Sequence, residues 1–338
     1  MATAAKLVIA MHSVRGIWHW PAAATDRLRA EYPQVAFHEY PRDSEDPLTP
    51  ASAAADAVLF SDADAVIAWR LDPRLYRNAR RLRWIHCPSA AVHQLLTPEL
   101  AAGPIVITNG ASVHAAMVAE HGLALLLALA RGLPQAQRSQ AERRWAPEAW
   151  LGQLRRLAGS TVVLAGLGHI GRELAPRLAA LGVTVLGVRR RPELAVAGCA
   201  AVYADAELES LLPRADALIL ALPSTGATAA RIGPAQLALL PRRAFLVNLG
   251  RGSALDETAL HEALVAGRLA GAALDVFAHE PLPPDSPLWH CPSVIITPHV
   301  AAAVPDTWEQ QTALVARHLR RFLAGEPLEP QVDKVRGY

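Results

Sequence analysis

The sequence predicts an α/β protein built from two doubly wound domains. Short apolar segments alternate with helical segments in the first part of the chain. A glycine-rich turn then joins a strand to a helix near residue 166, and the alternation continues from there to residue 297. Strands and helices that alternate in this way indicate parallel sheets covered by helices.

In the first part, β-branched and apolar runs predict strands, and the segments between them predict helices. The expected strands are 6–11, 35–40, 65–69 and 82–86, and the expected helices are 22–30, 51–60 and 73–80. A further strand at 105–108 leads into a long helix from Val113 to Arg131, whose middle is nearly all apolar. Such a helix is buried on more than one face, in its own domain or at a subunit interface. A polar helix (135–144) and an arm (145–157) follow.

Length and composition restrict the class of protein. The 338 residues suit two domains, and a hydrophobic content of 52% supplies two cores. A net charge of +2 argues against nucleic-acid binding, which needs a strongly basic surface. Three distant cysteines, at 87, 199 and 291, have no metal-ligand spacing and indicate a reducing compartment. We expect no bound metal, no signal peptide, no membrane span and a cytoplasmic location.

The turn at 166–171 predicts a dinucleotide site. The apolar strand 161–165 is followed by Gly166-Leu167-Gly168-His169-Ile170-Gly171 and then by a helix to residue 181. In this context the first glycine permits the tight turn, the second lets backbone approach a pyrophosphate, and the third lets the helix pack close to the strand. The helix N-terminus offers amides and a positive dipole to the phosphates. A purely structural glycine turn is the alternative.

The second part continues as a doubly wound sheet of six or seven strands. Besides 161–165, the expected strands are 183–188, 200–203, 217–222, 244–248, 270–274 and 294–297, and the expected helices are 206–212, 234–240, 256–266 and 305–324. Ligands of such sheets bind beyond the carboxyl ends of the strands. Arg251, Glu280 and His299 each follow one of the last three strands, so we expect them to converge.

These three residue types suit the reduction of a 2-oxo acid. Histidine, with an ordinary pKa of about 6.5, is a general acid near working pH, and a neighbouring carboxylate stabilises its charged form. The planar fork of an arginine suits the substrate carboxylate and polarises the carbonyl group. Individually, His299 as a helix cap and Glu280 as a surface residue are the simpler interpretations. Their occurrence together at successive strand ends favours catalysis.

The segments V-N-L-G-R-G, L-D-V-F-A-H-E-P-L and T-P-H-V-A closely resemble those of the D-isomer-specific 2-hydroxyacid dehydrogenases. The resemblance extends from about residue 65 to 321 and implies catalysis by Arg251, Glu280 and His299. It also implies a Rossmann NAD(P)-binding domain (105–298) inserted into a flavodoxin-like substrate domain (1–104 plus 299–338). The R-x-L-P at 131–134, with Gln140 and Trp145, resembles the glyoxylate/hydroxypyruvate reductase branch.

The cofactor is expected to be NADP(H), with NAD(H) possible. An NAD site usually has an acidic residue at the end of the second strand, where this chain has Arg189 and Arg190, which suit a ribose 2′-phosphate. A solvated arginine turn that tolerates both cofactors is the alternative. Besides the glycine turn and the two arginines, the resemblance implies cofactor contacts at Leu222, Pro223, Thr228, Asn248, Leu249, Gly250 and Asp275.

Substrate is expected at Ser89, Ala90 and Ala91 together with Arg251 and His299. Many family members carry glycines in that first loop, so the alanines leave its geometry, and the identity of the 2-oxo acid, open. The long helix resembles the family's dimer element, and we expect a homodimer. A non-catalytic NAD(P)H-sensing protein, as in related corepressors, and a dehydrogenase of phosphite or phosphoglycerate are the alternative functions. Formate dehydrogenases have Gln where Glu280 stands.

Overall fold

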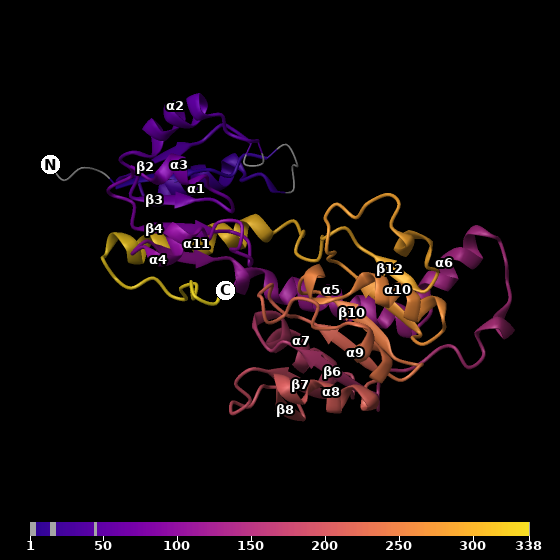
Figure 1. The fold of residues 1–338 in the computed structure, drawn as a ribbon. Helices are drawn as coiled ribbons and strands as arrows, with labels where there is room; N and C mark the ends of the chain where they lie inside the picture. The colour runs from indigo at the N-terminus through magenta and orange to yellow at the C-terminus, as the bar shows by residue number, and fades with distance from the viewer. Residues whose placement is uncertain (1–4, 14–17, 44–45, 338) are drawn as a thin grey trace. The chain divides into compact units, whose positions relative to one another are not determined.

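The computed structural model describes residues 5–13, 18–43 and 46–337, which divide into two units (Figure 1). The first unit comprises Met1–His114 and Ala303–Tyr338, and the second comprises Ala115–Ala302. The predicted boundaries, at 104/105 and 298/299, therefore differ from those of the structure. Residues 105–109 belong to the first unit because their strand, β5, is hydrogen-bonded along β4.

The first unit contains a five-stranded parallel sheet in the order β2-β1-β3-β4-β5. This is the flavodoxin-like order, so that part of the predicted fold is confirmed. Its strands are β1 (Ala5–Ile9), β2 (Val35–Glu39), β3 (Ala65–Ile67), β4 (Trp84–Cys87) and β5 (Val106–Asn109).

Helices cover both faces of this first sheet. Side chains alternate along each strand, so that Val8 faces a core formed with α2, α3 and α4, while Leu7 and Ile9 face a core formed with α1 and α11. The C-terminal helix thus returns to the sheet on which the chain begins. The helices are α1 (Ala22–Glu31), α2 (Pro50–Phe60), α3 (Pro73–Tyr76), α4 (Pro98–Ala102) and α11 (Thr307–Leu323).

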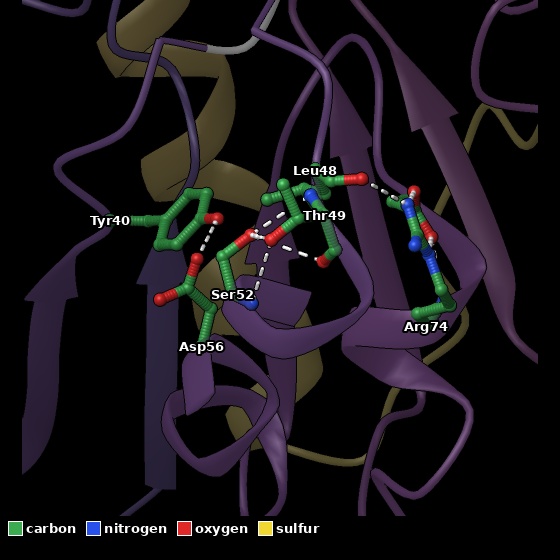
Figure 2. A network of polar contacts seen from close by, with 7 residues as sticks. Tyr40, Leu48, Thr49, Ser52, Asp56 and Arg74 are labelled. Atoms are coloured by element: carbon green, nitrogen blue, oxygen red, sulfur yellow. Dashed lines mark hydrogen bonds and ion pairs between the residues drawn. The ribbon is translucent and has the colours of Figure 1, made fainter. Parts of the chain in front are cut away.

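The start of α2 shows how local chemistry fixes an element (Figure 2). Thr49 and Ser52 form a reciprocal capping box, in which the Thr49 hydroxyl accepts from the Ser52 amide and Ser52 Oγ accepts from the Thr49 amide. One turn further on, the Tyr40 hydroxyl donates to Asp56 at 2.8 Å. The last of these bonds joins α2 to the residue that follows β2.

The second unit contains a seven-stranded parallel sheet in the order β12-β11-β10-β9-β6-β7-β8. The order reverses between β6 and β9, as in the Rossmann fold, and confirms the predicted doubly wound sheet. The strands are β6 (Thr161–Ala165), β7 (Thr184–Arg189), β8 (Ala201–Ala204), β9 (Ala217–Leu220), β10 (Phe245–Asn248), β11 (Gly271–Leu274) and β12 (Val294–Ile296).

Its two faces are buried by different helices. In β6, Val162 and Leu164 pack with α5 and α7, and Val163 and Ala165 pack with α8, α9 and α10. The helices are α5 (Ala111–Ala130), α6 (Leu133–Ala141), α7 (His169–Ala180), α8 (Leu208–Leu211), α9 (Pro234–Leu239) and α10 (Glu257–Val265). Single turns of 3₁₀ helix lie at η2 (Pro147–Trp150), η3 (Asp205–Glu207), η4 (Leu212–Arg214), η5 (Gly252–Ala254) and η6 (Pro287–His290).

Two helix predictions need correction, and one helix was missed. The helix expected at 206–212 is broken into η3, α8 and η4, and Pro213, which has no amide hydrogen, lies just where α8 gives way to η4. The helix expected at 73–80 ends at Tyr76. The short helix α4 was not predicted; Thr97 caps it by accepting from the Leu100 amide, and Pro98 occupies its first turn.

Helix α5 is longer and more apolar than a typical surface helix. Among the described residues it is the one helix that meets length and hydropathy criteria for a membrane span, and half of its apolar window is buried within the protein. Val118, Ala119, Leu125 and Leu126 belong to the core against the second sheet. The burial explains the apolar composition on this side of the helix.

Candidate active site

The glycine turn lies at the point where the order of the second sheet reverses. Gly166 has a φ of 105°, and a Cβ there would lie 2.4 Å from the carbonyl oxygen of Ala221, which follows β9. A Cβ at Gly171 would lie 2.1 Å from Gly166 O. Both positions therefore require glycine for close backbone packing. At Gly168, by contrast, a Cβ would meet no heavy atom of the described residues within 4 Å, apart from its neighbours in the chain.

The open space next to Gly168 lies at the N-terminus of α7. The amides of His169, Ile170 and Gly171 form the first turn and donate no hydrogen bond to described residues, whereas the Arg172 amide closes the helix onto Gly168 O at 3.1 Å. Unpaired first-turn amides and the helix dipole bind anions. Burial, with Arg172 nearby, lowers the pKa of His169, which favours the neutral imidazole. Leu167 is buried against β7. The turn thus fits a pyrophosphate.

Arg189 is the last residue of β7, and its side chain is half-buried. Its Nη1 atom is fully buried and has no hydrogen-bond partner among the described residues. A buried guanidinium nitrogen without a partner is unfavourable by about 1–3 kcal/mol, and a bound anionic group would satisfy it. The next residue, Arg190, is exposed. The end of β7 therefore fits a phosphate as well.

The loops after β9 and β10 approach each other closely. A Cβ at Gly250 would lie 2.5 Å from Leu222 O, which requires glycine there, and Leu249 is buried. The Asn248 side chain donates to Arg251 O at 3.1 Å and accepts from the Gly250 amide at 3.2 Å.

After β9, the Thr228 hydroxyl donates to Pro223 O at 2.6 Å. The polar groups of Thr228 and Asn248, both expected to contact cofactor, hydrogen-bond within the chain and fix the shape of these two loops.

Arg251 follows β10 directly. Its Nη1 donates to Gly250 O at 2.6 Å, which orients the guanidinium. Burial lowers the pKa of Arg251, and the nearby Glu280 charge opposes that shift. A guanidinium has five N–H donors, so a carboxylate can still be bound by two parallel hydrogen bonds.

Glu280 and His299 form a close pair. His299 Nδ1 lies 2.7 Å from Glu280 Oε2, and the second carboxylate oxygen accepts from the Phe277 amide at 3.0 Å. Burial alone would raise the pKa of Glu280, but the hydrogen bonds from His299 and Phe277 outweigh it and hold that pKa below its usual range. Because an ionised carboxylate only accepts, His299 Nδ1 carries a proton, and Nε2 is the atom that can exchange one with a ligand.

Asp275 fixes the segment that carries His299. The buried carboxylate accepts from Thr297 Oγ1 at 2.6 Å and from the amides of Val300 and Ala301 at 3.1 and 3.2 Å. His299 itself adopts a φ of 53°, which is unusual for a residue with a side chain. Burial opposes ionisation of Asp275, yet these bonds and one to His121 lower its pKa. Asp275 therefore stabilises the backbone on both sides of the predicted acid.

The predicted substrate loop belongs to the first unit and follows β4. Ser89 Oγ accepts from the Ala91 amide at 3.1 Å, and Ala90 O accepts from Asn109 Nδ2 at 3.1 Å. Before them, Pro88 O accepts from Gln311 Nε2 at 2.8 Å. The loop is thus held by side chains from β5 and α11.

The sequence interpretation missed Glu257 and Gly252, which contact the loop that carries Glu280. Glu257 accepts from the Ala278 amide at 2.6 Å, and Gly252 packs on the Phe277 backbone. Glu257 looked like an ordinary first-turn acid of a helix, and no spacing pattern distinguishes it.

The chain is similar to known dehydrogenases and reductases. Residues 123–301 match the sequence model of the NAD binding domain of D-isomer specific 2-hydroxyacid dehydrogenases. A glyoxylate reductase from Korarchaeum cryptofilum is 34% identical over 275 residues, which cover 78% of this chain and 81% of that protein. A D-3-phosphoglycerate dehydrogenase from Methanocaldococcus jannaschii is 32% identical over 277 residues, or 81% of this chain, but the match spans only 52% of that longer protein.

A solved structure extends the likeness to nearly the whole chain. An NADPH-dependent glyoxylate/hydroxypyruvate reductase from Sinorhizobium meliloti, in complex with NADP and sulfate, superimposes with a TM-score of 0.82 at 27% identity and covers 99% of this chain and 100% of its own. The sheet orders, the glycine turn and these matches agree, and the chain belongs to the D-isomer-specific 2-hydroxyacid dehydrogenase family.

Proposed function

We propose that this protein reduces a small 2-oxo acid to the D-2-hydroxy acid, with glyoxylate and hydroxypyruvate as the first candidates. The observation that carries the proposal is the 2.7 Å pair of His299 and Glu280, in the same unit as Arg251 and the glycine turn. The relatives named glyoxylate reductase support the substrate class.

Each side chain has a separate task in this reaction. Bound NAD(P)H supplies the hydride that reaches the carbonyl carbon. His299 Nε2–H donates the proton to the carbonyl oxygen, and Glu280 stabilises the imidazolium from the other side of the ring. Arg251 binds the substrate carboxylate and polarises the carbonyl group. The balanced reaction converts a 2-oxo acid, NAD(P)H and one proton into a 2-hydroxy acid and NAD(P)⁺. The loop at Ser89, Ala90 and Ala91 is proposed to contribute further donors to the substrate.

The test is cofactor oxidation with a panel of 2-oxo acids: glyoxylate, hydroxypyruvate, pyruvate, and branched and aromatic members. We expect turnover with the small acids and its loss in His299→Ala, with NADPH binding retained. Normal kcat in that variant would show that another group is the acid. No turnover with any acid, alongside tight NADPH binding, would instead favour a non-catalytic nucleotide sensor.

The phosphoglycerate dehydrogenase relatives favour a second candidate. The chain spans about half the length of those relatives, so their activity is a separate proposal for it. Oxidation of 3-phosphoglycerate, assayed beside phosphite in the same panel, tests it. Turnover of 3-phosphoglycerate faster than that of the D-2-hydroxy acids glycolate and glycerate would replace our first candidate.

We further propose that NADPH is preferred over NADH. The buried, unpaired Nη1 of Arg189 supports the proposal, as does the NADP bound by the solved relative from Sinorhizobium meliloti. Arg190 is the second candidate for the 2′-phosphate. A comparison of kcat/KM for NADPH and NADH tests the proposed preference. A clear preference for NADH would refute it.

We propose that the protein is a cytoplasmic homodimer that associates through the long helix and the arm that follows it. Leu127 on α5 is 37% exposed, and on the arm Trp145 and Leu151 are 94% and 82% exposed. Exposed apolar side chains on neighbouring elements are typical of subunit interfaces. Light scattering tests the proposal, and a monomer at micromolar concentration would contradict it. Three free cysteines support the reducing location.

A further inference from the structure

The backbone of Phe277 and Ala278 links the loop of Arg251 to the loop of Glu280. It is held from three sides. The Phe277 amide donates to Glu280 Oε1 at 3.0 Å, and the Ala278 amide donates to Glu257 Oε1 at 2.6 Å. On the third side, a Cβ at Gly252 would lie 1.8 Å from the Phe277 carbonyl carbon. The backbone next to Arg251 thus packs directly on the backbone that orients Glu280.

Glu257 is the one charged side chain among these three contacts that has no task in the proposed reaction. It is the first residue of α10, behind the capping residue Asp256. Its carboxylate is half-buried, and burial raises its pKa. The Ala278 amide and His279 oppose this shift, whereas Glu280 and Asp256 increase it. Because the folded protein binds this proton more tightly than an exposed glutamate, the charged form of Glu257 lowers stability at neutral pH.

Glu257 holds a backbone amide of this loop at 2.6 Å, and that amide belongs to the residue two positions before Glu280. The length of the glutamate side chain lets an acceptor oxygen reach this amide. Catalytic side chains must be held within about 0.5 Å of their working positions, and this precision comes from the groups behind them.

We propose that Glu257 is a positioning residue for the acid–base pair. By fixing the Ala278 amide, it sets the path of the 277–280 loop and thereby the contact between Glu280 and His299. The proposal rests on the proposed function, since it assigns a role to Glu257 in the proton transfer by His299.

Two substitutions separate position from charge. Glu257→Asp keeps the charge but withdraws the carboxylate by one methylene from the Ala278 amide. Glu257→Gln keeps an oxygen at the right reach but removes the charge. We expect the Asp variant to lose about tenfold in kcat/KM for the 2-oxo acid, equivalent to about 1.4 kcal/mol, with an unchanged Kd for NADPH. We expect the Gln variant to remain within about threefold of the wild type, because its oxygen still accepts from the amide. Glu262→Gln, at an exposed position on the same helix, is the control.

A second readout does not depend on turnover. The NMR signal of His299 Cε1–H, assigned by its absence in His299→Ala, reports the environment of the imidazole. It should shift in Glu257→Asp toward its position in Glu280→Gln and stay in place in Glu257→Gln. A wild-type protein without any oxo-acid turnover would refute the proposed function, and this signal would still test Glu257.

Three results would overturn the proposal. One is an Asp variant with wild-type kcat/KM and an unmoved His299 signal. Another is a larger loss in the Gln variant than in the Asp variant, which would make the charge and not the position the important property. The third is a parallel loss of NADPH affinity and turnover, which would indicate general loosening of the second unit.

Discussion

Gly168→Ala and Gly171→Ala each add one methyl group, at positions three residues apart. The first should weaken NADPH binding, and the second should weaken the fold. At Gly171 the new Cβ would lie 2.1 Å from Gly166 O, and ordinary contact begins near 3.4 Å, so the two backbone segments must separate by about 1.3 Å. Overpacking of this kind costs about 1–3 kcal/mol. For a unit of this size each kcal/mol lowers the melting temperature by about 2–4 °C.

At Gly168 the methyl group enters space that the protein leaves open. Apart from the two neighbours in the chain, no heavy atom of the part of the protein that the structure describes lies within 4 Å of the added Cβ, and the backbone is extended, with a φ of −76°. Alanine in an unstrained position stabilises a protein by about 0.4–1 kcal/mol, because it restricts the unfolded chain. The same methyl group stands where a pyrophosphate should approach the backbone, and we expect NADPH affinity to fall by about tenfold or more.

Thermal unfolding and fluorescence titration with NADPH, measured on both variants and the wild type, give four differences from the wild type that test these expectations. Gly171→Ala should melt at a lower temperature, and Gly168→Ala should melt no lower than the wild type but bind NADPH more weakly. Wild-type affinity in Gly168→Ala would refute the placement of the pyrophosphate at this turn. An unchanged melting temperature in Gly171→Ala would refute the close packing of α7 on the turn.

Three further predictions follow from individual contacts. Arg189→Ala should weaken NADPH binding about tenfold or more and leave NADH binding and the melting temperature unchanged. The reason is that Nη1 has no hydrogen-bond partner among the described residues. Equal losses of affinity in titrations with NADPH and NADH would contradict this prediction. Gln311→Ala removes a donor from Pro88 O and should raise KM for the 2-oxo acid more than KM for NADPH. An unchanged KM for the 2-oxo acid would show that this hydrogen bond does not position the substrate loop. The hydrogen bond from Arg231 lowers the pKa of Glu209 from 4.5 to about 2, so its contribution to stability is present above pH 4.5 and is lost as the pH falls toward 2. Glu209→Gln should flatten that part of the acid-unfolding curve, whereas a curve identical to the wild type would disprove the contribution.

The parts of the site that the sequence predicted are those fixed by local pattern and by the order of strands. A glycine spacing between an apolar strand and a helix locates the turn at 166–171, and the structure forms it at the reversal of the sheet. Arg251, Glu280 and His299 follow β10, β11 and β12, which are neighbours in the sheet. Because parallel strands end at one edge, the sequence order alone predicted that these residues gather, and the 2.7 Å contact follows from it.

Hydrogen bonds between side chains and the backbone of loops could not be predicted in this way. The Thr228 hydroxyl bonds Pro223 O and the Asn248 amide bonds Arg251 O, although both were assigned to the cofactor from their motifs. Glu257 lies 21 positions before its partner Ala278 and has the appearance of an ordinary helix-start acid. Which donor such a group meets depends on the turn between the elements, and turn geometry has no period in the sequence.

The domain boundary shows a related limit. The predicted boundary fell after Pro104, so residues 105–109 were grouped with the second domain. The pairing of β5 with β4 assigns them to the first sheet. Helix α5 begins in the first unit and continues into the second. Because the chain passes between the units inside a helix, no glycine- or proline-rich linker marks the boundary in the sequence. The division therefore follows from hydrogen bonding across strands, which sequence pattern does not specify.

The substrate loop has alanines where many family members carry glycines. In this chain the close packing around the loop requires a glycine at a different position, Gly110, one residue after β5. A Cβ there would lie 2.1 Å from Pro88 O and 2.3 Å from Gln311 Nε2. His114 Nε2 also lies 2.9 Å from Pro88 O. A loop whose first carbonyl is fixed by two side chains does not need glycines to define its path. Because Pro88 O is fixed, the backbone N–H groups of this loop have defined positions even with alanines at 90 and 91. The loop remains compatible with carboxylate binding.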